Sequence, residues 1–238
     1  LRFQFSNSFK QQDMFQNLIN KIKNLMMQKI IFLLAIILNL FEDINGLPYN
    51  FTHRANLTVY VDGQNRGDLA IGLYGHEAPK AVMNFLSQCE SRKEHKNLEN
   101  IFKLNLTDIE NKFSFTNKPI YKIYDTHMQF GDYFSERNNW RGNITIFGGS
   151  YYSEINDYET EIGALAQERL EENGHVGSEY TIFLKKASFD GRQSLWHVFG
   201  VVYQNLDLLK YLFYTASEND GTPQRNIKIM NCKITQYK

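Results

Sequence analysis

Residues 121–133, YKIYDTHMQFGDY, contain a basic side chain and an amide side chain that a short local structure would bring together. Two alternating runs flank the corner DTHMQ, and this pattern predicts a β-hairpin. The hairpin would aim Lys122 and Gln129 at the same place. A lysine ammonium donates hydrogen bonds, and a buried amide needs partners for its polar atoms. We therefore take Lys122 and Gln129 as the candidate catalytic pair.

The composition is that of a folded, strand-rich protein. The chain has 238 residues, of which 42% are hydrophobic and 14% aromatic, so it is long enough for one sizeable core. Lysine plus arginine number 26 and so do aspartate plus glutamate. This balance gives no basic surplus that would favour nucleic acid as a partner.

Alternating apolar patterns predict several short strands and two helices. One helix begins near Pro79, and the other has Asn205 as its N-cap. So many strands need their edges hidden, which favours a mainly β fold, an eight-stranded closed antiparallel barrel whose ends are capped by the helices. The strands are expected at 56–61, 69–75, 120–124, 128–133, 163–169, 178–184, 196–203 and 226–237.

The front of the chain has the pattern of a targeting segment. After Met26 and Met27 come one lysine, the apolar run Ile30–Leu38 and a polar stretch that ends at Gly46. The run is shorter than the roughly 20 residues of a membrane-spanning helix. It is typical of a secretory signal peptide cleaved after Gly46. The amphipathic stretch FQNLINKIKNL leaves open a mitochondrial presequence or a membrane anchor, and membrane contact is expected only if this segment is retained.

The expected domain plan follows from these boundaries. Residues 1–46 form the extension with the signal peptide, 47–56 a linker and 57–238 the folded domain. Within the domain, the polar stretch at about 93–115 is expected to be a surface insertion.

Glycosylation sequons support the secretory route, to the endoplasmic reticulum lumen or the exterior. Four N-x-[ST] triplets lie after the expected cleavage point, at Asn50, Asn56, Asn105 and Asn143. Cys89 and Cys232 are the only two cysteines. Two buried free thiols are the favoured interpretation, and a disulfide is the alternative if the fold brings the cysteines together.

The order of the segments from residue 57 to the end resembles the cyclophilin family of peptidyl-prolyl isomerases. The helix GHEAPKAVMNFLSQC, the strand HMQFGDY, the strand GSEYTIFL and the segment FDGRQSLWHVFGVVYQNLDLLKYL each resemble a family segment, in the family's order. The resemblance implies an eight-stranded barrel with two helices. It also implies catalysis of rotation about the bond before proline, whose barrier is about 18–20 kcal/mol.

The family's catalytic residues correspond only in part to this chain. Lys122 stands where the family has an arginine that donates towards the proline nitrogen, and lysine lacks that planar fork. Gln129 matches the family glutamine. The corner between them is one residue shorter, so either Thr126 or His127 replaces a pocket phenylalanine.

The groove that holds the proline ring also differs. Glu179 replaces a second glutamine, Thr181 replaces the main pocket phenylalanine, Phe189 replaces a leucine and Trp196 replaces the pocket histidine. Burial of one phenylalanine is worth about 1.5–3 kcal/mol, so the loss of two would weaken substrate binding. An ion pair between Glu179 and Lys122 would also divert the cation.

Two functions are therefore weighed. One is a prolyl isomerase that acts on X-Pro bonds during protein folding with a degenerate, weak active site. The other is an inactive barrel that serves as a peptide-binding or scaffold protein. Proline-containing segments or client proteins are the expected partners, and no cofactor is expected. No metal site is expected either, because His127 and His197 have no third ligand at suitable spacing.

Overall fold

The computed structural model describes residues 21–30, 51–89, 113–131, 145–154, 158–169, 174–187, 195–214 and 220–236. The chain divides into two compact units, Leu1–Tyr49 and Asn50–Lys238. In the first unit, residues 21–30 form a helix. Among the described residues, no helix is long and apolar enough to cross a membrane.

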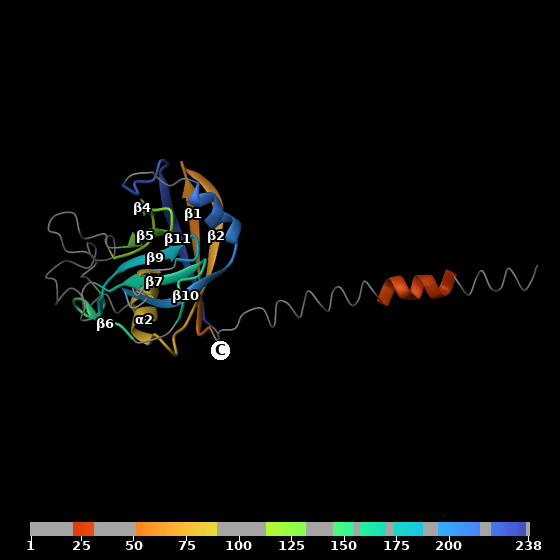
Figure 1. The fold of residues 1–238 in the computed structure, drawn as a ribbon, viewed down its shortest axis with the longest axis horizontal. Helices are drawn as coiled ribbons and strands as arrows, with labels where there is room; N and C mark the ends of the chain where they lie inside the picture. The colour runs from red at the N-terminus through yellow and green to blue at the C-terminus, as the bar shows by residue number, and fades with distance from the viewer. Residues whose placement is uncertain are drawn as a thin grey trace, which may run out of the picture. The chain divides into compact units, whose positions relative to one another are not determined.

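The second unit is built on a curled antiparallel sheet (Figure 1). Nine strands hydrogen-bond in the order β3-β11-β1-β2-β10-β7-β9-β5-β4. A separate pair consists of β6 and β8. The strands are β1 (His53–Val61), β2 (Gln64–Leu73), β3 (Lys118–Pro119), β4 (Lys122–Ile123), β5 (His127–Gly131), β6 (Tyr151–Tyr152), β7 (Ala164–Glu168), β8 (His175–Val176), β9 (Glu179–Phe183), β10 (Trp196–Gln204) and β11 (Ile227–Gln236).

The expected mainly β, antiparallel, barrel-like fold is confirmed, but the ring of hydrogen-bonded strands is not strictly closed. The ends of the nine-stranded order are β3 and β4, which do not pair with each other. They are consecutive in the chain and only Ile120 and Tyr121 lie between them. The Ile120 amide donates to Ile227 on one side, and the Tyr121 amide donates to Gln129 on the other. The barrel is therefore completed by residues 118–123, whose first half pairs with β11 and whose second half pairs with β5.

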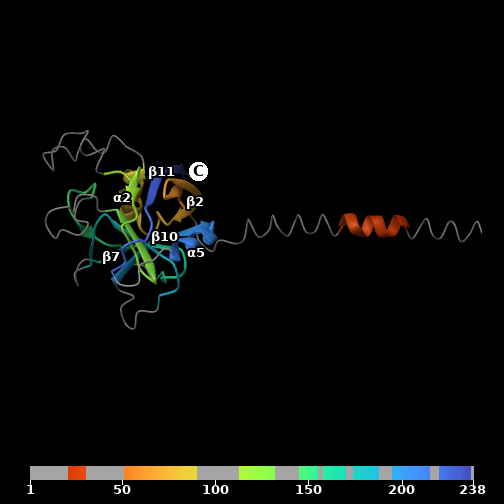
Figure 2. The ribbon, with the colours of Figure 1, turned by 90° about the horizontal axis from the view of Figure 1, so that it is seen from above.

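Helix α2 (Pro79–Cys89) closes one end of the barrel, and α5 (Leu206–Phe213) packs beside β2 (Figure 2). The apolar side of α2 is buried, with Phe85 fully inside the core. Its ring contacts Phe115, Tyr180 and Phe199 at centroid distances of 5.0–5.8 Å. These aromatic contacts fill the barrel interior.

Two details differ from the sequence-based expectations. Asn205 precedes α5 as predicted, but its side chain makes no cap hydrogen bond, because its backbone is left-handed and its amide donates to Asp68. Phe113 and Phe115, at the end of the expected insertion, are buried, whereas the rest of that segment lies outside the described residues.

The two cysteines form a disulfide between α2 and β11. The Cα atoms of Cys89 and Cys232 are 4.8 Å apart, and the bond closes a separation of 143 residues. The expectation of free thiols is therefore wrong. The reason is that α2 packs directly against β11, a long-range contact that the sequence spacing does not reveal.

Candidate active site

The β4–β5 hairpin brings together the two residues that the sequence singled out. Lys122 lies directly opposite Gln129, and Gln129 lies directly opposite Thr181 in β9. Residues directly opposite each other in antiparallel strands place their side chains on the same face, with Cβ atoms about 4.5–5.5 Å apart. We call Lys122, Gln129 and Thr181 the cross-strand row. It combines a cation, an amide and a hydroxyl on the sheet.

The Lys122 ammonium already has a partner within the chain. Its Nζ donates to the backbone carbonyl of Asp220 at 2.5 Å. The turn that carries this carbonyl is fixed, since the Asp220 carboxylate accepts from the amide and the hydroxyl of Thr222. The next carbonyl, that of Gly221, accepts from the Ile123 amide at 2.7 Å. The lysine therefore has a defined place at the edge of the row.

Glu179 lies two residues before Thr181 in β9 and is paired with Gly131. The lysine amino group donates to Asp220 instead of to this carboxylate. Gly131 has φ +90°, and a Cβ there would come within 2.2 Å of the Ser178 carbonyl. This position consequently requires glycine, as the resemblance of the strand to the family's glycine-rich strand suggests.

Next to the row, three aromatic rings pack against each other. The imidazole of His127 lies 5.6 Å from the indole of Trp196 and 5.9 Å from the ring of Phe183, measured between centroids. Phe183 and Trp196 meet edge to face at 5.1 Å. We call His127, Phe183 and Trp196 the aromatic set. Trp196 is only 7% exposed and Phe183 is fully buried, so these two rings pack mainly against the protein itself.

The charge state of His127 follows from this packing. Burial lowers the pKa of its imidazole to about 4, and the nearby carboxylate of Asp125 offsets this only in part. The ring is therefore neutral at physiological pH. Its Nδ1 lies 2.7 Å from the Thr126 hydroxyl. Of the two residues that the shortened corner offers, His127 is the one within the aromatic set.

Phe183 is the residue that the sequence interpretation missed. It lies opposite His127, two residues beyond Thr181 in β9, and therefore on the same face as Thr181. The strand period of two in the segment EYTIF indicates that Phe183 shares a face with Thr181. Phe189, the remaining groove candidate, lies outside the described residues.

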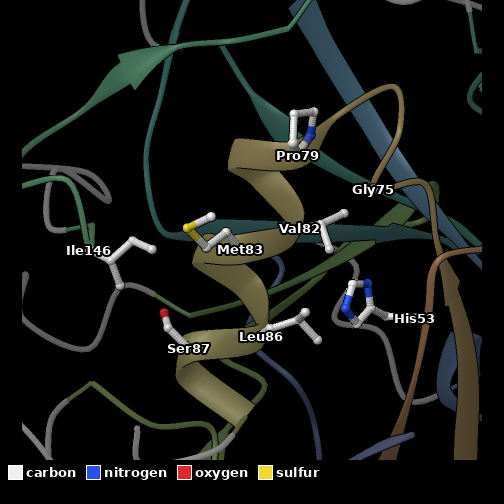
Figure 3. A pocket seen from close by; sticks show the side chains of 8 residues that line it. All are labelled: His53, Gly75, Pro79, Val82, Met83, Leu86, Ser87 and Ile146. Carbon is white, nitrogen blue, oxygen red and sulfur yellow. The ribbon is translucent and has the colours of Figure 1, made fainter. Parts of the chain in front are cut away.

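A hollow lies beside α2, away from the residues of the cross-strand row (Figure 3). Its volume is about 300 Å³, and Met83 at its centre is 53% exposed. None of its lining residues belongs to the predicted site. They are His53, Gly75, Pro79, Val82, Met83, Leu86, Ser87 and Ile146.

Next to Trp196 in β10, the buried imidazole of His197 lies close to a carboxylate that also contacts α2. The Nε2 atom of His197 lies 3.4 Å from Oε2 of Glu154, and the histidine side chain is fully buried. The other oxygen of Glu154 accepts from the Lys80 backbone amide in the first turn of α2. Burial lowers the pKa of His197 to about 3, and the positive charge of Arg169 acts in the same direction. The Glu154 carboxylate thus lies between the first turn of α2, to which it is hydrogen-bonded, and the neutral imidazole of His197 in β10.

Comparison with known proteins agrees with this architecture. The family model described as cyclophilin type peptidyl-prolyl cis-trans isomerase/CLD matches residues 57–234. The chain belongs to this family. It is similar to the peptidyl-prolyl cis-trans isomerase CYP21-1 of Arabidopsis thaliana, with 26% identity over 185 residues. That alignment covers 76% of this chain and 75% of the relative.

Proposed function

We propose that the protein is a slow peptidyl-prolyl isomerase that acts on X-Pro bonds of proteins during folding. The observation that carries the proposal is the direct cross-strand pairing of Lys122 with Gln129 in a chain of the cyclophilin family. In the proposed reaction the Lys122 ammonium donates towards the prolyl nitrogen and weakens the amide resonance. The Gln129 amide binds the carbonyl side. A twisted amide is then bound better than a planar one, which lowers the barrier.

Two features of the row support a low rate. The Lys122 ammonium must exchange its bond to the Asp220 carbonyl for a bond to substrate, or share its protons between them. Lysine also presents a point charge where a guanidinium presents a planar fork. Both effects reduce the preference for the twisted amide over the planar one.

The aromatic set supports weak substrate binding. Trp196 packs edge to face on His127 and on Phe183, so their rings are engaged with each other. Thr181 contributes a small, buried side chain beside them. A proline ring would therefore find less apolar surface than a phenylalanine at position 181 would provide.

A second function, an inactive peptide-binding or scaffold barrel, is favoured by the same mutual packing of Trp196 and His127. The two functions separate in one experiment that measures binding and catalysis together. A proline-containing peptide is titrated against the protein, and its cis–trans exchange is followed by magnetisation transfer. Exchange faster than in buffer, lost in Lys122→Ala but kept in Lys210→Ala, supports the enzyme. Binding with unchanged exchange in the wild type contradicts it.

We also propose that the protein enters the secretory pathway, with residues 1–46 as signal peptide and extension and 57–238 as the working domain. Residues 47–56 connect the two, and the last four of them already belong to β1. The Cys89–Cys232 disulfide supports this location, because structural disulfides persist mainly in oxidising compartments. The test is the N-terminal sequence of the mature protein purified from secreting cells. A terminus near residue 47 agrees with the proposal, and an intact N-terminus or a mitochondrial location contradicts it.

A further inference from the structure

We propose that Asn56 is a glycosylation site and carries an N-linked oligosaccharide on the outward face of β1. The inference rests on the secretory location proposed above and is independent of isomerase activity. Asn56, Leu57 and Thr58 form an N-x-[ST] triplet in the middle of the strand. Such a triplet is common by chance, so the structure around it has to decide whether the site is suitable.

The two residues that define the triplet share the solvent side of the strand. The burial pattern of β1 alternates, with Leu57 buried and Asn56 and Thr58 half-buried. Side chains two residues apart in a strand point to the same face. Leu57 anchors the strand in the core, while the asparagine and the threonine are both presented outward.

The cross-strand neighbours of Asn56 and Thr58 are polar or small. On the β11 side Asn56 lies opposite Lys233, which is exposed, and on the β2 side it lies opposite Ala70, which is small and buried. Thr58 lies opposite Asn231 and Asp68, which are also exposed. The strand neighbours are thus polar or small, as a solvated oligosaccharide requires.

The Asn56 amide is not committed to the fold. Among the described residues it forms no side-chain hydrogen bond, in contrast to Asn205, whose amide holds the Asp68 carbonyl. Modification of the Asn56 nitrogen would therefore break no internal contact. In sheet order, β2, β10 and β7 separate β1 from β9, and on the other side β11 and β3 separate it from β4, so Asn56 is not a neighbour of the cross-strand row.

The modification is a group transfer that the secretory pathway supplies. A lipid-linked oligosaccharyl diphosphate donates the sugar: a bond forms between the sugar C1 and Nδ2 of Asn56, and the bond between C1 and the phosphate oxygen breaks. The amide nitrogen loses one proton, and the lipid diphosphate leaves. The same compartment permits the Cys89–Cys232 disulfide, which is an observation independent of the triplet.

The test uses the full chain expressed in secreting eukaryotic cells, with glycopeptide mass spectrometry before and after peptide-N-glycosidase treatment. We expect a glycan on Asn56 in the wild type and in Thr58→Ser, and none in Asn56→Gln or Thr58→Val. Valine keeps the β-branched shape of threonine, so the strand is retained while the triplet is destroyed. Asn231→Gln, on the neighbouring strand and outside any triplet, is the matched control and should keep the glycan.

The other three triplets show whether a negative result concerns Asn56 alone or the proposed secretory location. Glycans on Asn50, Asn105 or Asn143 together with an unmodified Asn56 overturn the site at Asn56 and leave the location standing. An unglycosylated chain that stays inside the cell overturns both. Loss of the glycan in Asn56→Gln, with Thr58→Ser retaining it, supports the inference.

Discussion

The indole of Trp196 and the imidazole of His127 meet with 5.6 Å between their centroids, beside the row of Lys122, Gln129 and Thr181. Trp196 stands where the family resemblance implies a pocket histidine. The contact links the start of β10 with the start of β5 and gives the tryptophan a structural role. The place where the family resemblance implies that a proline ring binds is thus bordered by rings that already pack against each other.

Trp196→His should consequently raise isomerase activity. The smaller ring frees space in the aromatic set, and we expect kcat/KM to rise on the order of tenfold, which corresponds to about 1.4 kcal/mol. The free energy of unfolding should fall by about 2 kcal/mol, because a large buried side chain is truncated. Trp196→Phe is the control that keeps an aromatic ring. A loss of stability with no gain in activity would show that Trp196 does not limit access.

The low pKa of His127 predicts a pH-dependent stability. Its pKa in the folded protein is about 4, below the ordinary value of 6.5. Between about pH 4 and pH 6.5 the unfolded chain therefore binds a proton at this residue more readily than the folded chain does. The free energy of unfolding should therefore decrease as the pH falls from about 6.5 towards about 4, by up to about 3 kcal/mol from this group. His197, with a folded pKa of about 3, adds a decrease of the same sign that also begins near pH 6.5 and continues to about pH 3.

Urea denaturation at a series of pH values measures this effect. His127→Gln cannot be protonated, and its stability should fall less steeply over this range than that of the wild type. Met128→Leu, which replaces the buried neighbour of His127 by a non-titrating side chain of similar size, should keep the wild-type slope. Equal slopes for His127→Gln and the wild type would contradict the burial of a neutral His127.

The Cys89–Cys232 disulfide should contribute strongly to stability. It closes a separation of 143 residues, and a loop of that size is worth about 2–5 kcal/mol on unfolding. We expect dithiothreitol to lower the denaturation midpoint of the wild type, but not that of the double variant Cys89→Ala, Cys232→Ala. Titration of two free thiols in the native, unreduced protein would show that the bond is absent.

Glu154 should act as a side-chain cap for α2. Its Oε1 accepts from the Lys80 amide, and a negative charge at a helix N-terminus is favourable. Glu154→Ala should lower the free energy of unfolding by about 1–2 kcal/mol. Glu161→Ala, which removes an exposed partner of Lys186, should cost less than about 1 kcal/mol. Chemical denaturation measures both variants. Equal losses in the free energy of unfolding would contradict the prediction.

Much of this fold was predictable because its signals are local. The alternation of NLTVYV and WHVFGVVY predicts strands, and β1 and β10 contain them. The apolar spacing after Pro79 predicts a helix, and α2 begins at that residue. The open ladder between β3 and β4 was not predictable, because it depends on how a segment of six residues divides its hydrogen bonds between two neighbours.

The site was predictable only where its partners are close in sequence. Lys122 and Gln129 belong to one hairpin, and period-two alternation places them on one face. The bond from Lys122 to Asp220 joins residues 98 positions apart, and no local pattern indicates it. Phe183 and Trp196 come together across β7, where Ala164 and Ala166 leave space in the same cluster. Such contacts follow from the sheet order rather than from residue spacing.

The most direct test of the account is the rate of cis–trans exchange of a proline peptide with Lys122→Arg, the wild type and Lys122→Ala. We predict that Lys122→Arg is faster than the wild type, because arginine restores the planar donor while keeping the charge opposite Gln129. Lys122→Ala should fall to the uncatalysed rate. Equal rates for all three proteins would contradict a catalytic role of Lys122.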